Sequence, residues 1–144
     1  MHALVRADDF LTAEGVRDEV SIIAGGGLFS PGHFLKAMAL GADAIYIGTA
    51  AVLAMIHTQM VKTSPLEPPT QLALYSGRLK EQLDVDRAAQ SLANYLQSCV
   101  AEMVLGAVAL GKDDLSAVNR DDLCALTPYA VEITGVQPAY RPKK

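Results

Sequence analysis

Two short hydrophobic runs, each followed closely by glycine, dominate the first third of the chain. Residues 20–24 read Val-Ser-Ile-Ile-Ala, and residues 44–47 read Ala-Ile-Tyr-Ile. Both runs contain β-branched side chains, and short apolar runs that end at glycine are typical of buried strands. The pattern therefore predicts two buried strands.

The segments beside these strands carry helical signals. Ser30 and Pro31 are residue types favoured at a helix start, which predicts a helix over residues 33–40. Gly41 is the expected end of that helix, and residues 50–60 predict another apolar helix. The order strand, helix, strand, helix defines a βαβα unit, which implies two parallel strands joined by a right-handed crossover.

The segments on either side of this unit predict helix and irregular structure. Residues 2–14 have a weak helical period. Residues 63–70 contain three prolines, which make this stretch an irregular connection, and residues 75–79 predict a turn.

The second half of the chain predicts one long helix followed by shorter ones. Asp86 is a candidate cap for an amphipathic helix over residues 87–110. Short helices are expected over residues 113–118 and 119–126. From Thr127 onward we expect one turn of helix and then an extended tail.

These elements predict an α/β fold arranged in three consecutive segments. Residues 1–60 hold the βαβα unit, and residues 61–80 form a proline-rich connection. Residues 81–144 form a helical C-terminal extension that packs on the first segment. There is no internal repeat or low-complexity tract.

The two glycine loops are the main candidate for a functional site. Gly25, Gly26 and Gly27 follow the first strand, and Gly48 and Thr49 follow the second. In a parallel βαβ unit such loops lie side by side at the carboxyl ends of the strands, where these sheets bind ligands. Glycine lets backbone N–H groups approach a phosphate, and a helix N-terminus favours an anion. The spacing therefore predicts a phosphate site without naming the ligand.

Other polar residues are weaker candidates. His33 lies near the start of the first crossover helix, but it is interpreted as a surface or helix-start position. Lys36 is interpreted as a surface residue, and His57 as a satisfied polar position on the next helix. Asp8 and Asp9 are neighbours on a helix, point in different directions, and are interpreted as a solvated face. No Ser/His/Asp or Cys/His set predicts nucleophilic catalysis.

Composition excludes several classes of function. The net charge is −4 and the only basic cluster is the terminal Arg-Pro-Lys-Lys, so no nucleic-acid partner is expected. Residues 37–56 are the most apolar stretch, but they contain Gly41, Asp43 and Gly48, so no membrane span is expected there. The first residues lack the order of a signal peptide, and we expect a cytoplasmic location.

The cysteines give no metal-binding pattern. Cys99 and Cys124 are the two cysteines of the chain, with no CxxC and no Cys/His spacing. A metal site or an iron–sulfur cluster needs more ligands than these. Both are interpreted as buried, reduced thiols.

The region of the glycine loops also resembles a known family. Residues 20–51 read VSIIAGGGLFSPGHFLKAMALGADAIYIGTAA, which is similar to the FMN-binding domain of glutamate synthase, and in particular to single-domain proteins of the FMN-binding glutamate synthase family. The resemblance covers nearly the whole chain, and it continues through residues 67–72, 92–96, 109–112, 119–123 and 134–136.

This resemblance implies a fold, a cofactor and an activity. In the family, the matching portion supplies the last two strands of a (β/α)8 TIM-type barrel, followed by a helical region. Its glycine loops hold the FMN phosphate, a role that falls by position on Gly25, Gly26, Gly27, Gly48 and Thr49. The complete family domain passes electrons through FMN to reduce the 2-iminoglutarate formed from 2-oxoglutarate and ammonia.

The chain departs from the family pattern in two ways. Typical glutamate synthases bind a 3Fe–4S cluster through three cysteines shortly after the last barrel strand, whereas residues 60–71 contain no cysteine here. No iron–sulfur cluster is therefore expected. The family residues that contact the flavin ring and 2-oxoglutarate lie on earlier strands, so no catalytic residue and no activity are assigned to this chain alone.

The expected partners follow from those missing strands. A two-strand piece leaves parallel edges and apolar helix faces uncovered. Barrel strands from the same or another chain, or a second copy of this chain, are expected to cover them. Two other functions stay open: a non-catalytic module that binds flavin or another phosphate, and a phosphate-binding barrel enzyme with different chemistry.

Overall fold

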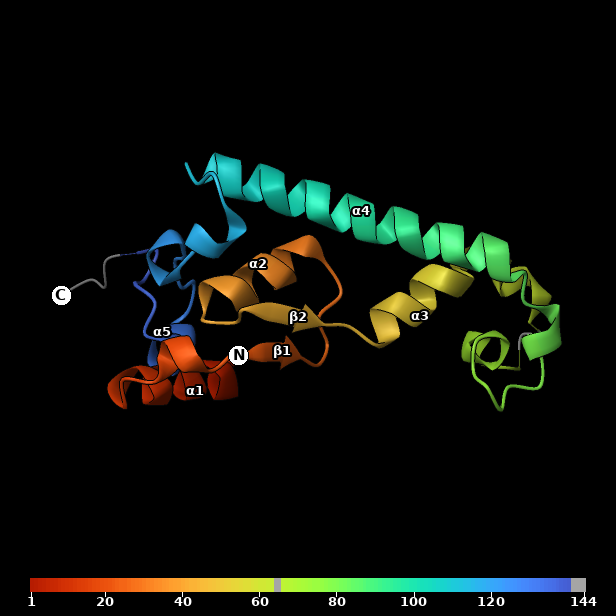
Figure 1. Cartoon of the computed structure of the whole chain (residues 1–144), viewed down its shortest axis with the longest axis horizontal. Helices are drawn as coiled ribbons and strands as arrows, with labels where there is room; N and C mark the ends of the chain where they lie inside the picture. The colour runs from red at the N-terminus through yellow and green to blue at the C-terminus, as the bar shows by residue number, and fades with distance from the viewer. Residues whose placement is uncertain (64–65, 141–144) are drawn as a thin grey trace. The chain divides into compact units, whose positions relative to one another are not determined.

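The computed structural model describes residues 1–63 and 66–140, and it is an α/β structure that is mostly helical (Figure 1). Two strands and several helices form in the order that the sequence pattern predicts. The strands are β1 (Ile23–Gly25) and β2 (Ala44–Tyr46), and the α-helices are α1 (His2–Ala13), α2 (Pro31–Ala39), α3 (Thr49–Ile56), α4 (Val85–Ala109) and α5 (Pro128–Thr134).

The chain divides into two compact units. The first contains residues 1–46 and 102–144, and the second contains residues 47–101. Helix α4 therefore contributes its N-terminal part to the second unit and its last turns to the first. The three segments predicted from the sequence stay a prediction.

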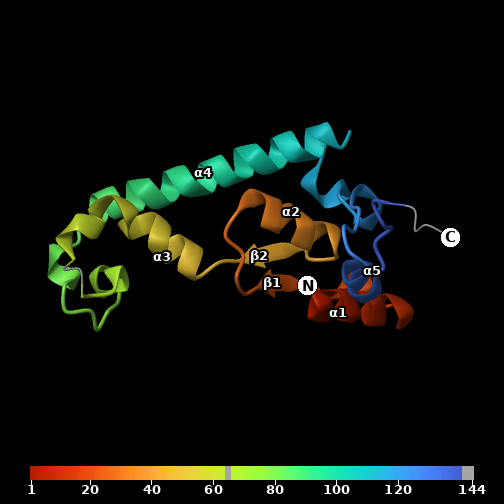
Figure 2. The same cartoon turned by 180° about the vertical axis from the view of Figure 1, so that it is seen from behind.

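The two strands pair in parallel, as predicted. Gly25 lies opposite Tyr46 in the ladder, and Ile23 lies opposite Ala44. Helix α2 connects the strands and packs against β2, and Figure 2 shows the same arrangement from behind. The predicted crossover from β1 through α2 to β2 is confirmed.

Helix α2 forms where its end signals predict. The Ser30 hydroxyl accepts a hydrogen bond from the His33 N–H at 3.4 Å, and Pro31 occupies the first turn. Gly41 follows the helix with φ of +105°, a conformation that L-residues rarely adopt. The sequence therefore determines both ends of this helix.

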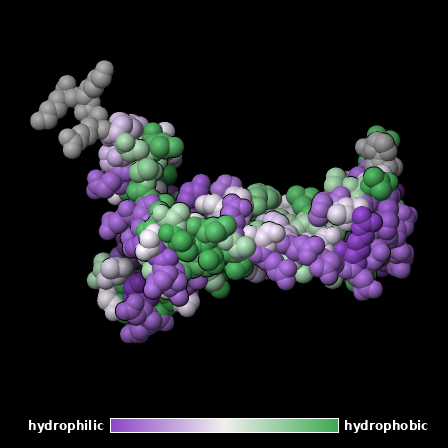
Figure 3. All heavy atoms as spheres, turned by 90° about the horizontal axis from the view of Figure 1, so that it is seen from above, coloured by the Kyte–Doolittle hydropathy of each residue, from purple (hydrophilic) through white to green (hydrophobic). Residues whose placement is uncertain are grey.

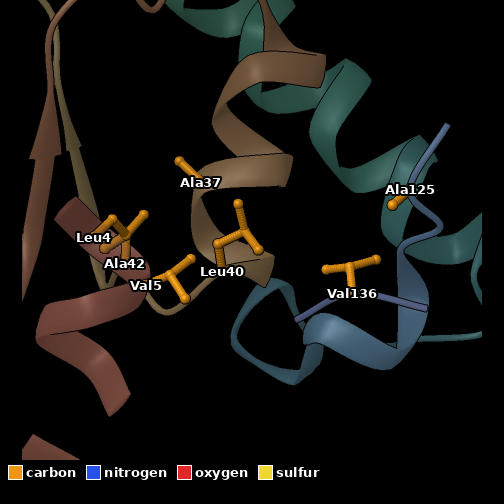
Figure 4. Close-up of a cluster of buried hydrophobic side chains, with 7 residues drawn as sticks. All are labelled: Leu4, Val5, Ala37, Leu40, Ala42, Ala125 and Val136. Carbon is orange, nitrogen blue, oxygen red and sulfur yellow. The ribbon is translucent and has the colours of Figure 1, made fainter. Parts of the chain in front are cut away.

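The core of the first unit joins segments that are distant in sequence. Figure 4 shows apolar side chains from α1, α2 and the C-terminal segment gathered around the end of α2. Helices α1 and α5 contact each other, and Ala125 pairs with Pro138 in a short parallel bridge. The buried members of this core are Leu4, Val5, Ala37, Leu40, Ala42, Ala125 and Val136.

Helix α4 begins at Val85, one residue before the residue that was predicted to cap it. The predicted cap Asp86 is wrong, because the Asp84 carboxylate accepts the Arg87 N–H at 3.0 Å and the helix starts at Val85. Asp84 provides the acceptor because the chain before α4 is anchored by tertiary hydrogen bonds.

The short C-terminal helices also differ from the prediction. The two expected helices after α4 are only turns of 3-10 helix, over Leu115–Ala117 and Arg120–Asp122. Conversely, α5 is longer than the single predicted turn, because Thr127 caps it and Gly135 ends it. The last residues of the described chain are not a free tail, since Ala139 N–H donates to the Ala125 carbonyl at 2.9 Å.

Large apolar faces are uncovered in the described part of the chain. On the sheet, Ile23 is 62% exposed and Tyr46 is 72% exposed. On α4, side chains four residues apart are between 43% and 62% exposed, and Figure 3 shows hydrophobic atoms gathered over this part of the helix. These exposed α4 residues are Leu96, Val100, Val104 and Val108.

Helix α4 is also the one helix among the described residues that is long and apolar enough to cross a membrane. One such helix is weak evidence for a membrane span, since length and composition alone select it. The apolar stretch at residues 37–56 forms the end of α2, strand β2 and all of α3, in the predicted order. The predicted burial of the two strands is wrong, because the end residues of each strand are exposed and only the middle residue is half-buried.

Candidate functional site

The first glycine loop begins at the end of β1. Gly25, Gly26 and Gly27 are exposed. Gly26 has φ of +104° and Gly27 has φ of +67°, so both positions favour glycine for conformational reasons. A Cβ on either residue would meet no atom within 4 Å. The loop therefore presents open backbone rather than side chains.

The second glycine loop leads into α3. Gly48 precedes the helix, is exposed, and would have open space around a Cβ. No side chain caps α3, whereas Ser30 caps α2 and Thr127 caps α5. The N–H groups of the first helical turn precede the first intrahelical hydrogen bonds, so they are available to an external acceptor. The exposed Thr49 adds a hydroxyl group.

The parallel ladder relates the two loops through the chain. Because Gly25 pairs with Tyr46 in parallel strands, the chain leaves both strands at the same end of the sheet. Gly26 and Gly27 follow the first strand there, and Gly48 comes two residues after the second. The first three glycines belong to the first unit, and Gly48 and Thr49 belong to the second.

Of the two histidines considered from the sequence, His33 lies near the first glycine loop, whereas His57 follows the C-terminal end of α3. His33 is half-buried, and its Nδ1 accepts the Phe29 N–H at 3.4 Å, so it helps to hold the end of the first loop. His57 is exposed, and its Nδ1 lies 2.8 Å from the Ala54 carbonyl oxygen. Since a carbonyl only accepts, this nitrogen carries a proton. Lys36 is exposed.

A polar network lies where α2 runs into β2, and it includes a residue that was interpreted wrongly from the sequence. Asp8 is not part of a solvated face, because its side chain is only 19% exposed. One of its carboxylate oxygens accepts from Arg17 at 2.7 Å and the other from Arg120 at 2.8 Å. Asp9 is exposed, as predicted, but it also pairs with Arg120 at 2.7 Å.

Arg17 connects this network to the start of β2. Its guanidinium donates to the Gly41 carbonyl at 2.9 Å and to the Asp43 carboxylate at 3.0 Å. Asp43 also accepts the Ile22 N–H at 2.7 Å, and this bond together with Arg17 lowers the pKa of the Asp43 carboxyl. The hydrogen bonds from Arg17 to Asp8 and Asp43 raise the pKa of its guanidinium.

This network lines a cavity of about 450 Å³, which also contains Leu115, Ser116 and Asn119. The charged side chains of the network, from Asp8, Arg17, Asp43 and Arg120, are paired with one another. The nearby Asp114 and Asn119 side chains accept hydrogen bonds from backbone N–H groups. The arrangement is that of a structural ion-pair network between α1, β2 and the C-terminal turns. Sequence reasoning did not find it, because its members come from four separate segments.

The lowered pKa of Asp43 predicts a change in acid stability. A carboxyl whose pKa falls on folding stabilises the fold above its ordinary value of 3.8, and that contribution is lost as the pH falls through the lower, folded value. We expect Asp43→Asn to reduce the free energy of unfolding at pH 7 by about 1 kcal/mol or less, since the side chain is 43% exposed. The difference between the two proteins should persist down to the ordinary value of 3.8 and disappear as the pH falls from there through the lower, folded value. Urea unfolding from pH 2 to 7 measures this, and parallel curves would contradict it.

The cysteines and acidic residues give no metal centre in the described chain. Cys99 is buried on α4, as predicted, but Cys124 is exposed, so its predicted burial is wrong. Cys124 lies in the extended segment between the last 3-10 turn and α5, not in a helix. Among the residues that the structure describes, no three His, Cys, Asp or Glu side chains are grouped to hold a metal ion.

The fold and its loops define an α/β protein with two parallel strands, each followed by an exposed glycine loop. Residues 1–113 match the model of the conserved region in glutamate synthase. The chain belongs to this glutamate synthase family, as its resemblance implied.

Curated relatives agree with this family. The chain is 33% identical over 141 residues to the archaeal glutamate synthase [NADPH] of Methanocaldococcus jannaschii, and 32% identical over 142 residues to the archaeal-type glutamate synthase [NADPH] of Thermotoga neapolitana. Each alignment covers 95% of this chain and 28% of the relative. A glutamate synthase large subunit-like protein of Rhizobium meliloti is 32% identical over 138 residues, which are 85% of this chain and 31% of that protein.

The chain therefore spans less than a third of the length of these relatives. No solved structure matches it. These sequence matches establish the family of this chain.

Proposed function

We propose that this chain is the C-terminal, FMN-phosphate-binding portion of a glutamate-synthase-like flavin oxidoreductase. The observation that carries the proposal is the start of α3, where an exposed glycine replaces a capping side chain and leaves the first-turn N–H groups available. A helix start of this kind favours a dianion such as the FMN phosphate. The chain's membership of the glutamate synthase family supports FMN over other phosphates.

The open backbone of each loop supports the proposal of a phosphate ligand. Gly26, Gly27 and Gly48 all have open space where a side chain would begin, so a ligand can approach the backbone there. Gly25 differs, because its Cβ would lie 3.5 Å from the Tyr46 Cβ. In the proposed site, the backbone of the three loop glycines and of Gly48 faces the phosphate, and Thr49 donates its hydroxyl hydrogen.

In the complete protein, bound FMN would supply electron transfer for the reduction of 2-iminoglutarate, formed from 2-oxoglutarate and ammonia. The residues of this chain would anchor and orient the phosphate tail. Within this division of labour, the groups that contact the flavin ring and the substrate come from barrel strands outside these 144 residues. The proposed fold is accordingly the last two strands of a (β/α)8 barrel.

The partner we propose is the rest of that barrel, from the same or another chain. Support comes from the bare sheet face, where Ile23 and Tyr46 are mostly exposed, and from the short share of the relatives that the chain spans. Apolar side chains at these positions would enter a barrel interior. Self-association of the chain would cover the same face, and a cytoplasmic location stays a prediction.

The experiment that tests this proposal compares FMN with riboflavin, which lacks the phosphate. We expect the purified chain to bind FMN at millimolar concentration or better, and riboflavin at least about tenfold more weakly, because the phosphate provides charge-assisted hydrogen bonds. Equilibrium dialysis with flavin absorbance measures both affinities. Equal affinities would contradict a phosphate anchor, and no glutamate formation is expected from the chain alone.

The two other functions give different outcomes. A non-catalytic flavin module would bind FMN equally well but stay inactive when co-expressed with the missing barrel strands. A barrel enzyme of different chemistry would bind inorganic phosphate or another phosphorylated ligand in preference to FMN. Competition of FMN binding by inorganic phosphate, measured in the same dialysis cell, separates the latter case.

A further inference from the structure

Hydrogen bonds from one buried side chain connect the two ends of the segment between α3 and α4. Gln59 lies in the 3-10 helix η2 (His57–Lys62) and is 1% exposed. Its Nε2 donates to the Asp84 carbonyl at 2.9 Å, and its Oε1 accepts the Asp84 N–H at 2.9 Å. The carboxamide thus pairs with the backbone just before α4 as a neighbouring strand would.

The orientation of this amide is fixed by its neighbours. Lys62 Nζ donates to Gln59 Oε1 at 2.9 Å and to the Gln82 carbonyl at 2.8 Å. Both the ammonium and the Asp84 N–H are donors only, so they must face the oxygen of the amide. Each oxygen lone pair then has a partner, and Gln59 links η2, Lys62 and the start of α4 in a single arrangement.

Buried apolar side chains and a second side-chain hydrogen bond stabilise other described parts of this segment. Leu72, in the 3-10 helix η3 (Pro69–Leu72), is fully buried, as is Ile56 at the end of α3. The Gln71 side chain accepts the Arg78 N–H at 3.2 Å. A Cβ on Gly77 would lie 2.0 Å from the Gln71 carbonyl oxygen, so the backbone at Gly77 packs directly against the backbone at Gln71.

This is the segment where the family resemblance implies an iron–sulfur cluster. A 3Fe–4S cluster needs three thiolates, and residues 60–71 contain no cysteine. Of the two cysteines, Cys99 is buried on α4 and Cys124 belongs to the other unit. The donor set of this chain does not fit the cluster, and Lys62 and Gln71 of this segment make hydrogen bonds within the protein.

We propose that η2 and residues 82–84 are held together without a metal, and that the Gln59 carboxamide provides the cross-link between η2 and the start of α4 that a cluster would otherwise provide. The proposal is independent of FMN binding, because every contact in it lies within the second unit. A buried amide can hold two backbone segments together in this way because an unpaired buried polar group is costly.

Hydrogen exchange of the whole chain tests the cross-link. In Gln59→Leu, we expect amides in residues 57–84 to exchange about tenfold faster or more, because the Asp84 backbone groups lose their partner. Gln97→Leu is the matched control, since Gln97 is exposed on α4. If Gln59→Leu does not fold, Lys62→Met removes one hydrogen bond to the same amide and should give a smaller acceleration. Equal exchange in the variant and the control would overturn the cross-link.

Anaerobic reconstitution with iron and sulfide tests the metal independence. We expect no stoichiometric iron or acid-labile sulfide in the purified chain, and unchanged exchange rates over residues 57–84. Stoichiometric incorporation, with slower exchange in this segment, would overturn the proposal. FMN binding is not a readout in either experiment, so failure of the proposed function leaves this result distinguishable.

Discussion

Replacing Gly41 with alanine should destabilise the first unit more than any other alanine substitution in its loops. Gly41 has φ of +105°, and a Cβ there would lie 2.4 Å from the Asp8 carboxylate carbon and within 2.7 Å of both its oxygens. Asp8 has little freedom to move away, because Arg17 and Arg120 hold its two oxygens. The variant must therefore strain the backbone and break ion pairs at the same time.

We expect Gly41→Ala to reduce the free energy of unfolding by about 3 kcal/mol or more, with the strained backbone contributing about 1–3 kcal/mol of this. For a chain of this size, that loss lowers the melting temperature by about 6–12 °C. Thermal unfolding by circular dichroism measures the change.

Gly15→Ala is the matched control for Gly41→Ala. Gly15 also has a positive φ, +72°, but a Cβ there would meet nothing within 4 Å. Its loss should be limited to the backbone term of about 1–2 kcal/mol. If the two variants lose equal stability, the contact between Gly41 and Asp8 is not the cause.

Replacing Gly48 with valine should remove phosphate binding without unfolding the protein. The space around a Cβ at Gly48 is open in the protein without ligand, and φ is −115°, so valine neither clashes nor requires a left-handed backbone. In the proposed complex, the same space is where the phosphate approaches the N-terminus of α3. We expect FMN affinity to fall at least about 100-fold, since several charge-assisted hydrogen bonds are lost.

Two controls make the Gly48→Val result specific. Its melting temperature should stay within about 3 °C of the parent chain, because a surface change away from packing costs little. Thr49→Ala should weaken FMN binding by only about 2–12-fold, the loss of one hydroxyl hydrogen bond. Unchanged FMN affinity in Gly48→Val would remove Gly48 from the proposed site.

The sequence determined the βαβα order because its signals are local. Ser30 and Pro31 start α2 and Gly41 ends it, since capping and left-handed φ depend on a few neighbouring atoms. The strands were predicted from short apolar runs, although they form only at Ile23–Gly25 and Ala44–Tyr46. Their ends depend on pairing and on the Asp43 carboxylate, which takes the Ile22 N–H.

At the candidate site too, the sequence predicted the positions of the glycine loops, and the structure added how the following helix begins. The sequence alone located Gly26, Gly27 and Gly48 after apolar strands, and these positions are exposed with open space around them. The structure added that α3 starts without a side-chain cap, in contrast to α2. A missing cap could not be read from the residue types alone, because glycine before a helix is also an ordinary boundary signal.

Only the tertiary structure decided the roles of residues whose partners are distant in the chain. Asp8 looked like a solvated carboxylate until Arg17 and Arg120 were placed beside it, and Gln59 had no local signal for pairing with Asp84. Side-chain hydrogen bonds across such separations depend on how the elements pack, and no periodicity in the sequence encodes them. The local pattern therefore fixed where the glycine loops and their helices form, while packing fixed which polar groups hold them in place.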